Sequence, residues 1–437
     1  MLSKITILKN HAGFTRYFKN TSWMMAEQFL RIIAGIFVGI WVARYLGPNQ
    51  FGLFSYVLAF TAIFGGIAKL GLDGIMVREL VNHPDKYNIY LGTAFWLKVL
   101  GALLVVGAMA AIVPFTSNDA ATNLFIFIIG ASLVFQSSEV IEFYFQSQVL
   151  GKIISICKVI QIVLSTIIKI YLVITEVELI YFILVIAFDA ISLAVSYFIA
   201  YKLGKNASFY KHFDLNIAKK LLRDSWPFML SIVVFSIYLQ MDIIMIREML
   251  GEYEAGLYAA GLKLALSHIF LSTIITISLF PALLNSKKIS KYNYEQRIQR
   301  LFSLLILINF FAAITISVTG DVLLDSLFGS AYSPAYNVLI IQTWSSIFAA
   351  IGFAFHQILM AENLGELALL RAIFGLVINL LLNLILIPIY GIVGAAIALL
   401  ISQIFSNYIF DIFFKRSHRF FILKTKSFFM LSLIQKN

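Results

Sequence analysis

The chain has 437 residues, of which 61% are hydrophobic and 13% are charged, and its formal net charge at pH 7 is +11. Soluble globular domains are roughly half apolar and a quarter charged, so this composition excludes a soluble domain and predicts an integral membrane protein. The single cysteine, Cys157, excludes an intramolecular disulfide and a cysteine-based metal site.

Apolar runs long enough to cross a bilayer follow one another along the whole chain. A span needs roughly 20 predominantly apolar residues. About twelve such runs begin near residues 22, 51, 90, 122, 153, 180, 227, 256, 301, 336, 367 and 391. The runs are continuous and do not alternate every second residue, which excludes a membrane β-barrel. The sequence therefore predicts an all-α membrane protein of about twelve transmembrane helices.

A short phrase occurs twice in the chain. Leu46-Gly47 is followed after four residues by Gly52-Leu53-Phe54, and the same spacing returns about 204 positions later in Leu250-Gly251 and Gly256-Leu257-Tyr258. The helices that precede the two copies open on Ser22-Trp23 and Ser225-Trp226, at offsets that agree to within one residue, which argues against coincidence. The repeat predicts two six-helix bundles of parallel orientation, related by a pseudo-twofold axis along the membrane normal.

The longest polar stretch, Lys202 to Arg223, divides six predicted spans from six. We predict an N-terminal lobe at 1–201, a cytoplasmic linker at 202–224, a C-terminal lobe at 225–414 and a basic tail at 415–437. The tail is too short and too charged to span a bilayer, and we expect it to form an amphipathic helix at the inner surface.

The distribution of basic residues predicts the orientation in the membrane. Lys and Arg gather at the N-terminus (Lys4, Lys9, Arg16, Lys19), in 202–223, in 287–300 and in the tail, whereas loops 114–121, 175–179, 320–334 and 388–391 contain none. By the positive-inside rule, both termini are predicted to be cytoplasmic. The first twenty residues lack the pattern of a cleavable signal, so we expect the start to be retained.

Several ionisable residues fall inside the predicted spans. Each costs about 2.5 to 3.5 kcal/mol at the centre of a lipid-facing helix, so most must face protein or water. They are Glu27, Arg31, Lys98, Glu139, Glu142, Lys158, Lys169, Asp189, Asp242, Lys263 and Arg371.

Spacing predicts how some of these charges combine. The fourth and fifth predicted helices each carry one polar stripe, and Glu142 and Lys158 should lie at similar depth, so we predict that they pair. Glu27 and Arg31 are four residues apart and form a predicted i,i+4 pair. Such pairs are open to two interpretations, a path for an anion or a device that only assembles helices. A further stripe, Arg371, Gly375, Asn379 and Asn383, is typical of helix packing.

Other residues are assigned by exclusion. Lys98 and Lys263 have no opposite charge nearby in sequence, which makes them candidates for contacting an anion. His268 and His356 are isolated on apolar helices, which favours interior histidines over a metal or proton site. The chain contains no P-loop, no zinc-ligand spacing and no dinucleotide-binding turn, so no cofactor, metal site or catalytic group is predicted.

Two segments resemble a known family. Residues 43–54, which contain Arg44, Gly47 and Gly52, and residues 71–80, which contain Asp73, Arg78 and Glu79, resemble the opening of the Wzx-type O-antigen flippases, which are polysaccharide-export proteins. Weaker echoes are residues 279–283 and 327–332. The resemblance implies a fold like that of multidrug and toxic-compound extruders and a bacterial inner-membrane location. It also implies translocation of an undecaprenyl-pyrophosphate-linked oligosaccharide from the cytoplasmic to the periplasmic leaflet.

The resemblance gives the membrane charges candidate roles. We expect Arg31, Lys98, Lys158, Lys263 and Arg371 to line a wet cleft between the lobes and to contact the pyrophosphate. We expect Glu27, Asp189 and Asp242 to serve coupling by H⁺ or Na⁺, because a buried carboxylate can titrate or bind a cation. Expected partners are membrane lipids, a polysaccharide polymerase and a chain-length regulator, with no nucleic acid.

Three other functions stay open. A drug/cation antiporter of the same superfamily favours an acidic cavity, whereas this interior offers about as many cations as carboxylates. A membrane glycosyl-polymerase, which is an enzyme, usually has large outer loops, whereas these are short. A lipid II flippase is disfavoured because no additional pair of spans follows at the C-terminus.

Overall fold

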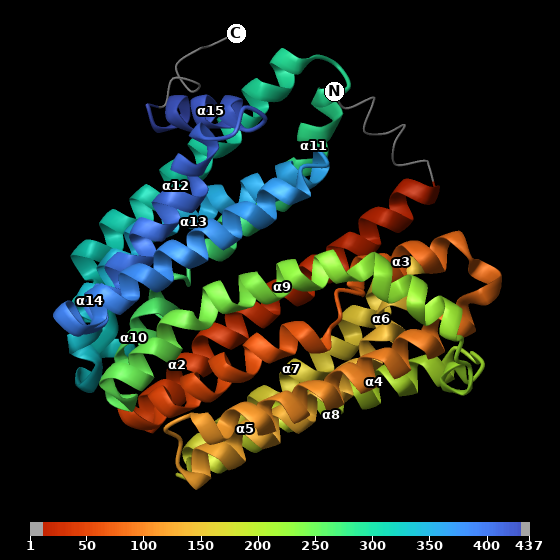
Figure 1. Ribbon diagram of the computed structural model, residues 1–437, viewed down its shortest axis with the longest axis horizontal. Coiled ribbons are helices and arrows are strands. Elements are labelled where there is room, and N and C mark those ends of the chain that lie inside the picture. Colours follow the sequence, from red (N-terminus) through yellow and green to blue (C-terminus); the bar gives the residue numbers. More distant parts are fainter. Residues whose placement is uncertain (1–11, 430–437) are drawn as a thin grey trace. The chain divides into compact units, whose positions relative to one another are not determined.

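The computed structural model describes residues 12–429, with the side chains of residue 20 and of residues 22–429, and the described residues form helices and connecting turns (Figure 1). The α-helices are α2 (Ala12–Ala68), α3 (Asp73–Asn82), α4 (Tyr87–Ile112), α5 (Ala120–Ser132), α6 (Glu139–Ser147), α7 (Gly151–Ile174), α8 (Leu179–Leu203), α9 (Leu215–Leu250), α10 (Glu252–Ala265), α11 (Ile269–Lys287), α12 (Lys291–Leu327), α13 (Tyr336–Ala361), α14 (Gly365–Asn407) and α15 (His418–Phe428). Short 3₁₀ helices include η3 (Leu133–Ser138) and η4 (Phe209–Lys211).

Ten segments of the described chain are long and apolar enough to cross a membrane. Two of them contain a residue with non-helical backbone angles, Gly47 in α2 (φ 68°, ψ 170°) and Gly391 in α14 (φ 58°, ψ −140°). These glycines divide the two segments, and counting each half separately gives twelve, as the sequence predicts. The chain is a multi-pass, all-helical membrane protein.

The chain forms two compact units. Unit 1 comprises the chain up to Val42 together with Val57–Ser236, and unit 2 comprises Ala43–Tyr56 together with Ile237–Asn437. Helices α2 and α9 therefore each contribute to both units. The lobe and linker boundaries proposed from sequence, at 201, 224 and 414, stay a prediction, because the units are defined by compactness and not by a linker.

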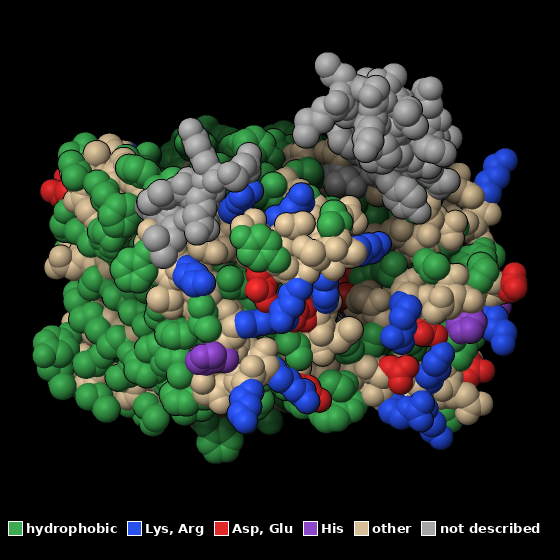
Figure 2. All heavy atoms as spheres, turned by 90° about the horizontal axis from the view of Figure 1, so that it is seen from above, with side chains coloured by type: hydrophobic (Ala, Val, Ile, Leu, Met, Phe, Trp, Pro, Cys, Tyr) green, Lys and Arg blue, Asp and Glu red, His purple; other side chains and the backbone are tan. Residues whose placement is uncertain are grey.

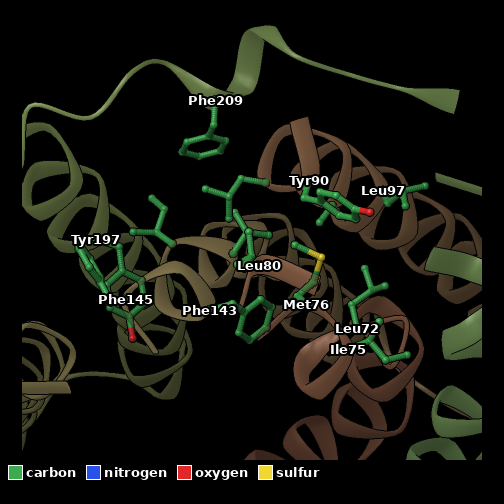
Figure 3. Packing of buried hydrophobic residues seen from close by; sticks show 14 of the residues in the cluster. Leu72, Ile75, Met76, Leu80, Tyr90, Leu97, Phe143, Phe145, Tyr197 and Phe209 are labelled. Atoms are coloured by element: carbon green, nitrogen blue, oxygen red, sulfur yellow. The ribbon is translucent and has the colours of Figure 1, made fainter. Parts of the chain in front are cut away.

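Unit 1 has an apolar core where α3, α4, α6 and the end of α8 meet the start of α9 (Figure 3). Its buried members include Met76 from α3, Tyr90 from α4, Phe143 from α6 and Tyr197 from α8. Phe209, in the polar stretch between α8 and α9, is also buried in this core. The stretch around Phe209 is therefore packed against unit 1.

The fourth predicted span is interrupted. The sequence predicts one continuous helix with a polar stripe through Gln136, Glu139, Glu142 and Gln146, whereas the structure has α5, the 3₁₀ helix η3 and then α6. Gln136 lies in η3, and Glu139 opens α6. A 3₁₀ segment has three residues per turn, so it rotates the following helix relative to a continuous α-helix. The prediction of a single α-helical stripe is therefore wrong at Gln136.

Unit 2 packs α12, α13 and α14 side by side (Figure 1). The predicted amphipathic tail helix is present as α15, and it docks on this unit, with Phe420 buried and its ring 5.0 Å from that of Phe355. Figure 2 views the molecule from the side on which Figure 1 draws α15, and Lys and Arg side chains are exposed on this face. The predicted orientation stays a prediction; Lys4, Lys9 and residues 430–437 lie outside the described residues.

The two copies of the repeated phrase pack against each other within unit 2. Gly47 and Gly251 have φ values of 68° and 98°, in the region that favours glycine, and each ends one helix and begins the next. A Cβ added to Gly52 would overlap the carbonyl oxygen of Glu252, and a Cβ added to Gly256 would overlap that of Pro48. The contact is reciprocal between equivalent positions, so the repeat produces a local twofold arrangement of two backbones in close approach.

Candidate functional site

A buried carboxylate in unit 2 is surrounded by neutral polar side chains. Asp242, from the part of α9 that belongs to unit 2, is 3% exposed. Asn383 of α14 donates from Nδ2 to its Oδ1 at 2.6 Å, and the hydroxyl of Tyr258 of α10 donates to its Oδ2 at 2.7 Å. Gln342 of α13 donates to the Tyr258 hydroxyl at 3.3 Å. Four helices thus converge on one carboxylate.

Asp242 has no cation beside it. Within residues 12–429, no Lys, Arg or His side chain forms an ion pair with Asp242. A buried carboxylate that is ionised requires pairing or coordination, because desolvation of an isolated charge is costly. Two neutral donors supply only part of that compensation. The site therefore fits a carboxylate that accepts either a proton or a small cation.

Two buried polar atoms next to Asp242 have no hydrogen-bond partner among the described residues. They are Oδ1 of Asn383 and Nδ2 of Asn379. Asn379 accepts a hydrogen bond from Asn383 at 3.2 Å, so the two amides are linked in a chain that ends on Asp242. An unpartnered amide oxygen beside a carboxylate is the type of ligand that hard cations prefer. The site thus offers oxygen ligands and a negative charge at one buried point.

Local sequence explains why these residues meet. Asn379 and Asn383 are one helical turn apart on α14, so they share a face. Tyr258 occupies the last position of the second copy of the repeat, where the first copy has Phe54. Sequence analysis missed Tyr258 and Gln342 and assigned the asparagines to packing. One feature of the sequence could have indicated Tyr258 as a site residue. The second copy of the repeat ends in Tyr258 where the first ends in Phe54, so only the second copy carries a hydroxyl there.

Unit 1 contains half-buried carboxylates that are each paired with a cation. Glu142 accepts from Nζ of Lys158 at 2.7 Å, as predicted, and from the Tyr197 hydroxyl at 2.7 Å. Asp189 accepts from Lys169 at 3.3 Å and from Ser165 at 2.9 Å. These pairs lie on facing helices α6, α7 and α8. Among the predicted site residues, Lys158 and Asp189 are therefore both neutralised by partners.

The surroundings of Lys98 differ from those predicted. Its side chain is 2% exposed, and Nζ lies 2.7 Å from Oε2 of Glu139 and 3.8 Å from Oδ1 of Asp73. The statement that Lys98 lacks an opposite charge nearby is wrong, because its partners lie 41 and 25 residues away and meet it only through the packing of α3, α4 and α6. Lys98 is thus a paired interior lysine, which its neighbours in sequence do not reveal.

The other cations that were predicted to contact the pyrophosphate lie on α2, α10 and α14. Arg31 pairs with Glu27 on α2, as its spacing predicts. Lys263 of α10 is half-buried, with Nζ 5.9 Å from the ring centroid of Phe51. Arg371 is buried in α14 and donates to the Gly352 carbonyl at 3.2 Å. Convergence of these cations on one cleft stays a prediction.

Arg371 belongs to a second buried charge cluster in unit 2. Its guanidinium lies 5.1 Å from the ring centroid of Phe355, and Nζ of Lys424 lies 3.6 Å from the same centroid. Lys424 also forms an ion pair with Asp411 at 2.6 Å and is fully buried. Burial lowers the pKa of Lys424 to about 8, although Asp411 opposes that shift. The cluster fastens α15 to the ends of α13 and α14.

The family-motif residues hold helix ends together. Glu79 is a buried hub that accepts from Lys220 at 2.6 Å, from Arg78 at 3.1 Å and from the Tyr90 hydroxyl at 3.4 Å. Glu79 therefore ties α3 to α4 and to α9. Arg44 donates to the carbonyl of Ser326 at 2.8 Å. These contacts give the motif an architectural role.

His268 is an interior side chain, as predicted, whereas His356, for which the same was predicted, is exposed. Nε2 of His268 lies 2.9 Å from the Ser346 hydroxyl, a neutral partner within unit 2. Across the described residues, no group of three or more His, Cys, Asp or Glu side chains is arranged to hold a metal ion. Asp242 therefore stands alone as a carboxylate among amides and a phenol.

The fold is that of known membrane transporters. Over 93% of this chain and 96% of the other, it matches the inward-facing conformation of a multidrug resistance MATE family transporter of the MOP superfamily, with a TM-score of 0.68 and 13% identity. It matches the lipid II flippase MurJ in an inward closed conformation with a TM-score of 0.68 and 17% identity, over 94% of this chain and 92% of that one. The chain is therefore an all-helical membrane protein with a MATE- and MurJ-like fold.

The family is shown by the sequence match. Residues 17–287 match the family model described as polysaccharide biosynthesis protein. The chain belongs to this polysaccharide biosynthesis family. The probable low-salt glycan biosynthesis flippase Agl15 of Haloferax volcanii is 25% identical over 377 residues, which cover 84% of this chain and 77% of that protein. These relatives are flippases and transporters, not enzymes, which confirms the family resemblance seen in residues 43–54 and 71–80.

Proposed function

We propose that this protein is a flippase for an undecaprenyl-pyrophosphate-linked oligosaccharide, and that inward movement of H⁺ or Na⁺ through the Asp242 site drives it. The flippase assignment is supported by the family and by the related glycan biosynthesis flippase. The coupling assignment rests on one observation, a buried carboxylate held by neutral donors. We propose transport from the cytoplasmic to the periplasmic leaflet in a bacterial inner membrane.

The charge of the substrate agrees with outward transport. A pyrophosphate is anionic, and an inside-negative potential favours its outward movement by about 2.3 kcal/mol per charge per 100 mV. Lys263 and Arg371 remain our candidate contacts for that headgroup. Arg31, Lys98 and Lys158 join them only if their pairs with Glu27, Glu139 and Glu142 open. Inward movement of a cation on Asp242 adds to the same driving force, because both steps move charge down the membrane potential.

Glu27 and Asp189 are weaker coupling candidates than Asp242. Each already has a cation partner, Arg31 and Lys169 respectively. A carboxylate paired in this way must first release its partner before it binds another cation. We therefore assign coupling to Asp242 and use Asp189 as the matched comparison.

The test reconstitutes the full chain in vesicles and follows transfer of a fluorescent undecaprenyl-pyrophosphate-linked oligosaccharide between leaflets. Gradients of Na⁺ and of pH are applied separately at a fixed membrane potential. Wild type should be accelerated by one of the two gradients. Asp242→Asn should abolish that acceleration, because the amide neither titrates nor carries charge, while Asp189→Asn should retain it.

Two outcomes contradict different parts of the proposal. If Asp242→Asn keeps the gradient dependence of wild type, Asp242 is not the coupling site. If purified wild type transfers no lipid-linked oligosaccharide but exports a cationic drug, the flippase assignment is wrong and the antiporter alternative is favoured. A gain of long-chain polymer with purified protein would favour the polymerase alternative.

A further inference from the structure

A groove opens on the surface of unit 1 between α7 and α8. Its volume is about 690 Å³, within the size range of ligand pockets in proteins. Ile153, Ile156 and Ile160 line it from α7, and Ile199 and Leu203 line it from α8. Several of these side chains are also exposed, including Ile160 at 47%. The groove is a mainly apolar, partly enclosed pocket that lies largely within membrane-spanning segments.

The groove is shorter than the hydrocarbon core of a bilayer. The α7 residues that line it, Ile153 to Ile160, span seven residues, which corresponds to about 10 Å at 1.5 Å per residue. The hydrocarbon core is about 30 Å thick, so the groove fits within one leaflet of about 15 Å. Beyond it on α7 lie Ser165 and Lys169, which bind Asp189. The part of α7 that lines the groove ends at Ile160.

The other end of the groove is polar and basic. Tyr144 and Asn206 line this end, and the Tyr144 hydroxyl donates to Oδ1 of Asn206 at 3.0 Å. Lys202 and Lys205 flank the lining residues Leu203, Gly204 and Asn206, and both are exposed. Within the described part of the chain neither lysine forms an ion pair, so their charge is available to a ligand.

We propose that this groove binds an acyl chain of an anionic phospholipid, with the phosphate at Lys202 and Lys205. The apolar wall suits an acyl chain, the groove fits within one leaflet, and the lysines suit a negative headgroup. Each lysine near a membrane surface contributes about 1 kcal/mol toward an anionic lipid, which corresponds to about fivefold in affinity. A polyprenyl chain is longer than a leaflet and would pass the end of the groove. The inference is independent of the proposed transport function.

Native mass spectrometry of the full chain, purified and equilibrated with equal amounts of phosphatidylglycerol and phosphatidylcholine, tests this site. Wild type should retain phosphatidylglycerol about 25-fold over phosphatidylcholine, which is about fivefold for each of the two lysines. Ile160→Trp should fill the groove and lower retention about tenfold. Ile167→Trp, on the same helix at a position that is 58% exposed and outside the groove, should behave as wild type. Lys202→Gln with Lys205→Gln should remove the preference between the two lipids.

A second readout uses Cys157, the single cysteine, which lines the groove. Phosphatidylglycerol should slow its reaction with a small uncharged thiol reagent in unaltered wild type, and phosphatidylcholine should not. This measurement tests the site even if Ile160→Trp fails to fold. Equal retention of the two lipids, unchanged retention in a folded Ile160→Trp variant, equal Cys157 protection by both lipids, or preferential retention of undecaprenyl phosphate would each overturn the proposal.

Discussion

The lysine-paired carboxylates of unit 1 and Asp242 of unit 2 are held in different ways. Asp411 of unit 2, which is buried and paired with Lys424, is of the same kind as those of unit 1. In unit 1, Glu79, Glu139, Glu142 and Asp189 each lie within 3.5 Å of a lysine nitrogen. In unit 2, Asp242 is as deeply buried as the most enclosed of them, yet its hydrogen bonds come from an amide and a phenol. Both units are built from the same kind of helical bundle. The difference lies in the type of donor that the neighbouring helices provide.

This difference separates two uses of a buried charge. A carboxylate with a lysine partner is electrically neutral as a pair, so it tolerates burial and connects helices. A carboxylate with neutral donors keeps an uncompensated charge that a mobile cation or a proton can neutralise. The comparison therefore favours an assembly role for the lysine-paired carboxylates and supports the ion binding that we propose for Asp242. Four measurements test this comparison.

The largest expected effect is on the Lys98 pair. Glu139→Gln leaves a lysine that is 2% exposed with only Asp73, at 3.8 Å, as a partner. We expect the free energy of unfolding in detergent to fall by about 3 kcal/mol. Adding Lys98→Met should recover most of this loss, because an apolar side chain needs no partner. If Glu139→Gln is neutral, the pairs of unit 1 do not stabilise its assembly.

The second effect is the pH dependence caused by Lys424. Its pKa in the folded protein is about 8, below the ordinary value of 10.5. Between these values the unfolded chain binds more protons than the folded one, so the free energy of unfolding rises with pH across this window. The expected gain from pH 8 to 10.5 is about 2 to 3 kcal/mol.

Lys424→Met provides the control for that measurement. The variant should lack the rise between pH 8 and 10.5 that wild type shows in thermal unfolding. The titrating groups away from Asp411 are unchanged, so subtracting one curve from the other isolates the Lys424–Asp411 pair. A wild-type stability that is flat or falls across this window would contradict the lowered pKa of Lys424 and would mean that its pair with Asp411 outweighs the effect of burial.

A smaller effect is expected at Asp242. Asp242→Asn removes a buried charge but also weakens the hydrogen bonds from Asn383 and Tyr258. These changes oppose each other, so the free energy of unfolding should change by no more than about 1 kcal/mol. Thermal unfolding of Asp242→Asn and Glu139→Gln measured together tests the contrast between the units directly. A loss at Asp242 as large as that at Glu139 would place Asp242 among the assembly residues.

The smallest effect is expected at an exposed pair in unit 1. Arg223 is 81% exposed and its Nε lies 3.7 Å from Asp224. Exposed pairs contribute little, because water and salt screen them, so Arg223→Gln should change the free energy of unfolding by less than about 0.5 kcal/mol. A larger change would mean that the detergent belt, and not water, surrounds this end of α9.

Some of the interior could be predicted from the sequence. The Glu27–Arg31 pair follows from one helical turn, and the Glu142–Lys158 pair follows from a short loop between antiparallel helices. The ion pairs of Lys98 could not be predicted, because its partners come from two other helices. Gln136 was misplaced because periodicity alone does not show where an α-helix gives way to a 3₁₀ turn.

Composition and hydropathy by themselves determined that this chain crosses a membrane many times as helices, because an apolar segment in lipid must satisfy its own backbone hydrogen bonds. The repeated glycine phrase and the motif at residues 71–80 determined the family. Only the tertiary structure decided which charges are paired, what surrounds Asp242 and where the groove beside Cys157 lies. A helical period fixes the face on which a side chain lies, but its partners belong to helices brought beside it by packing.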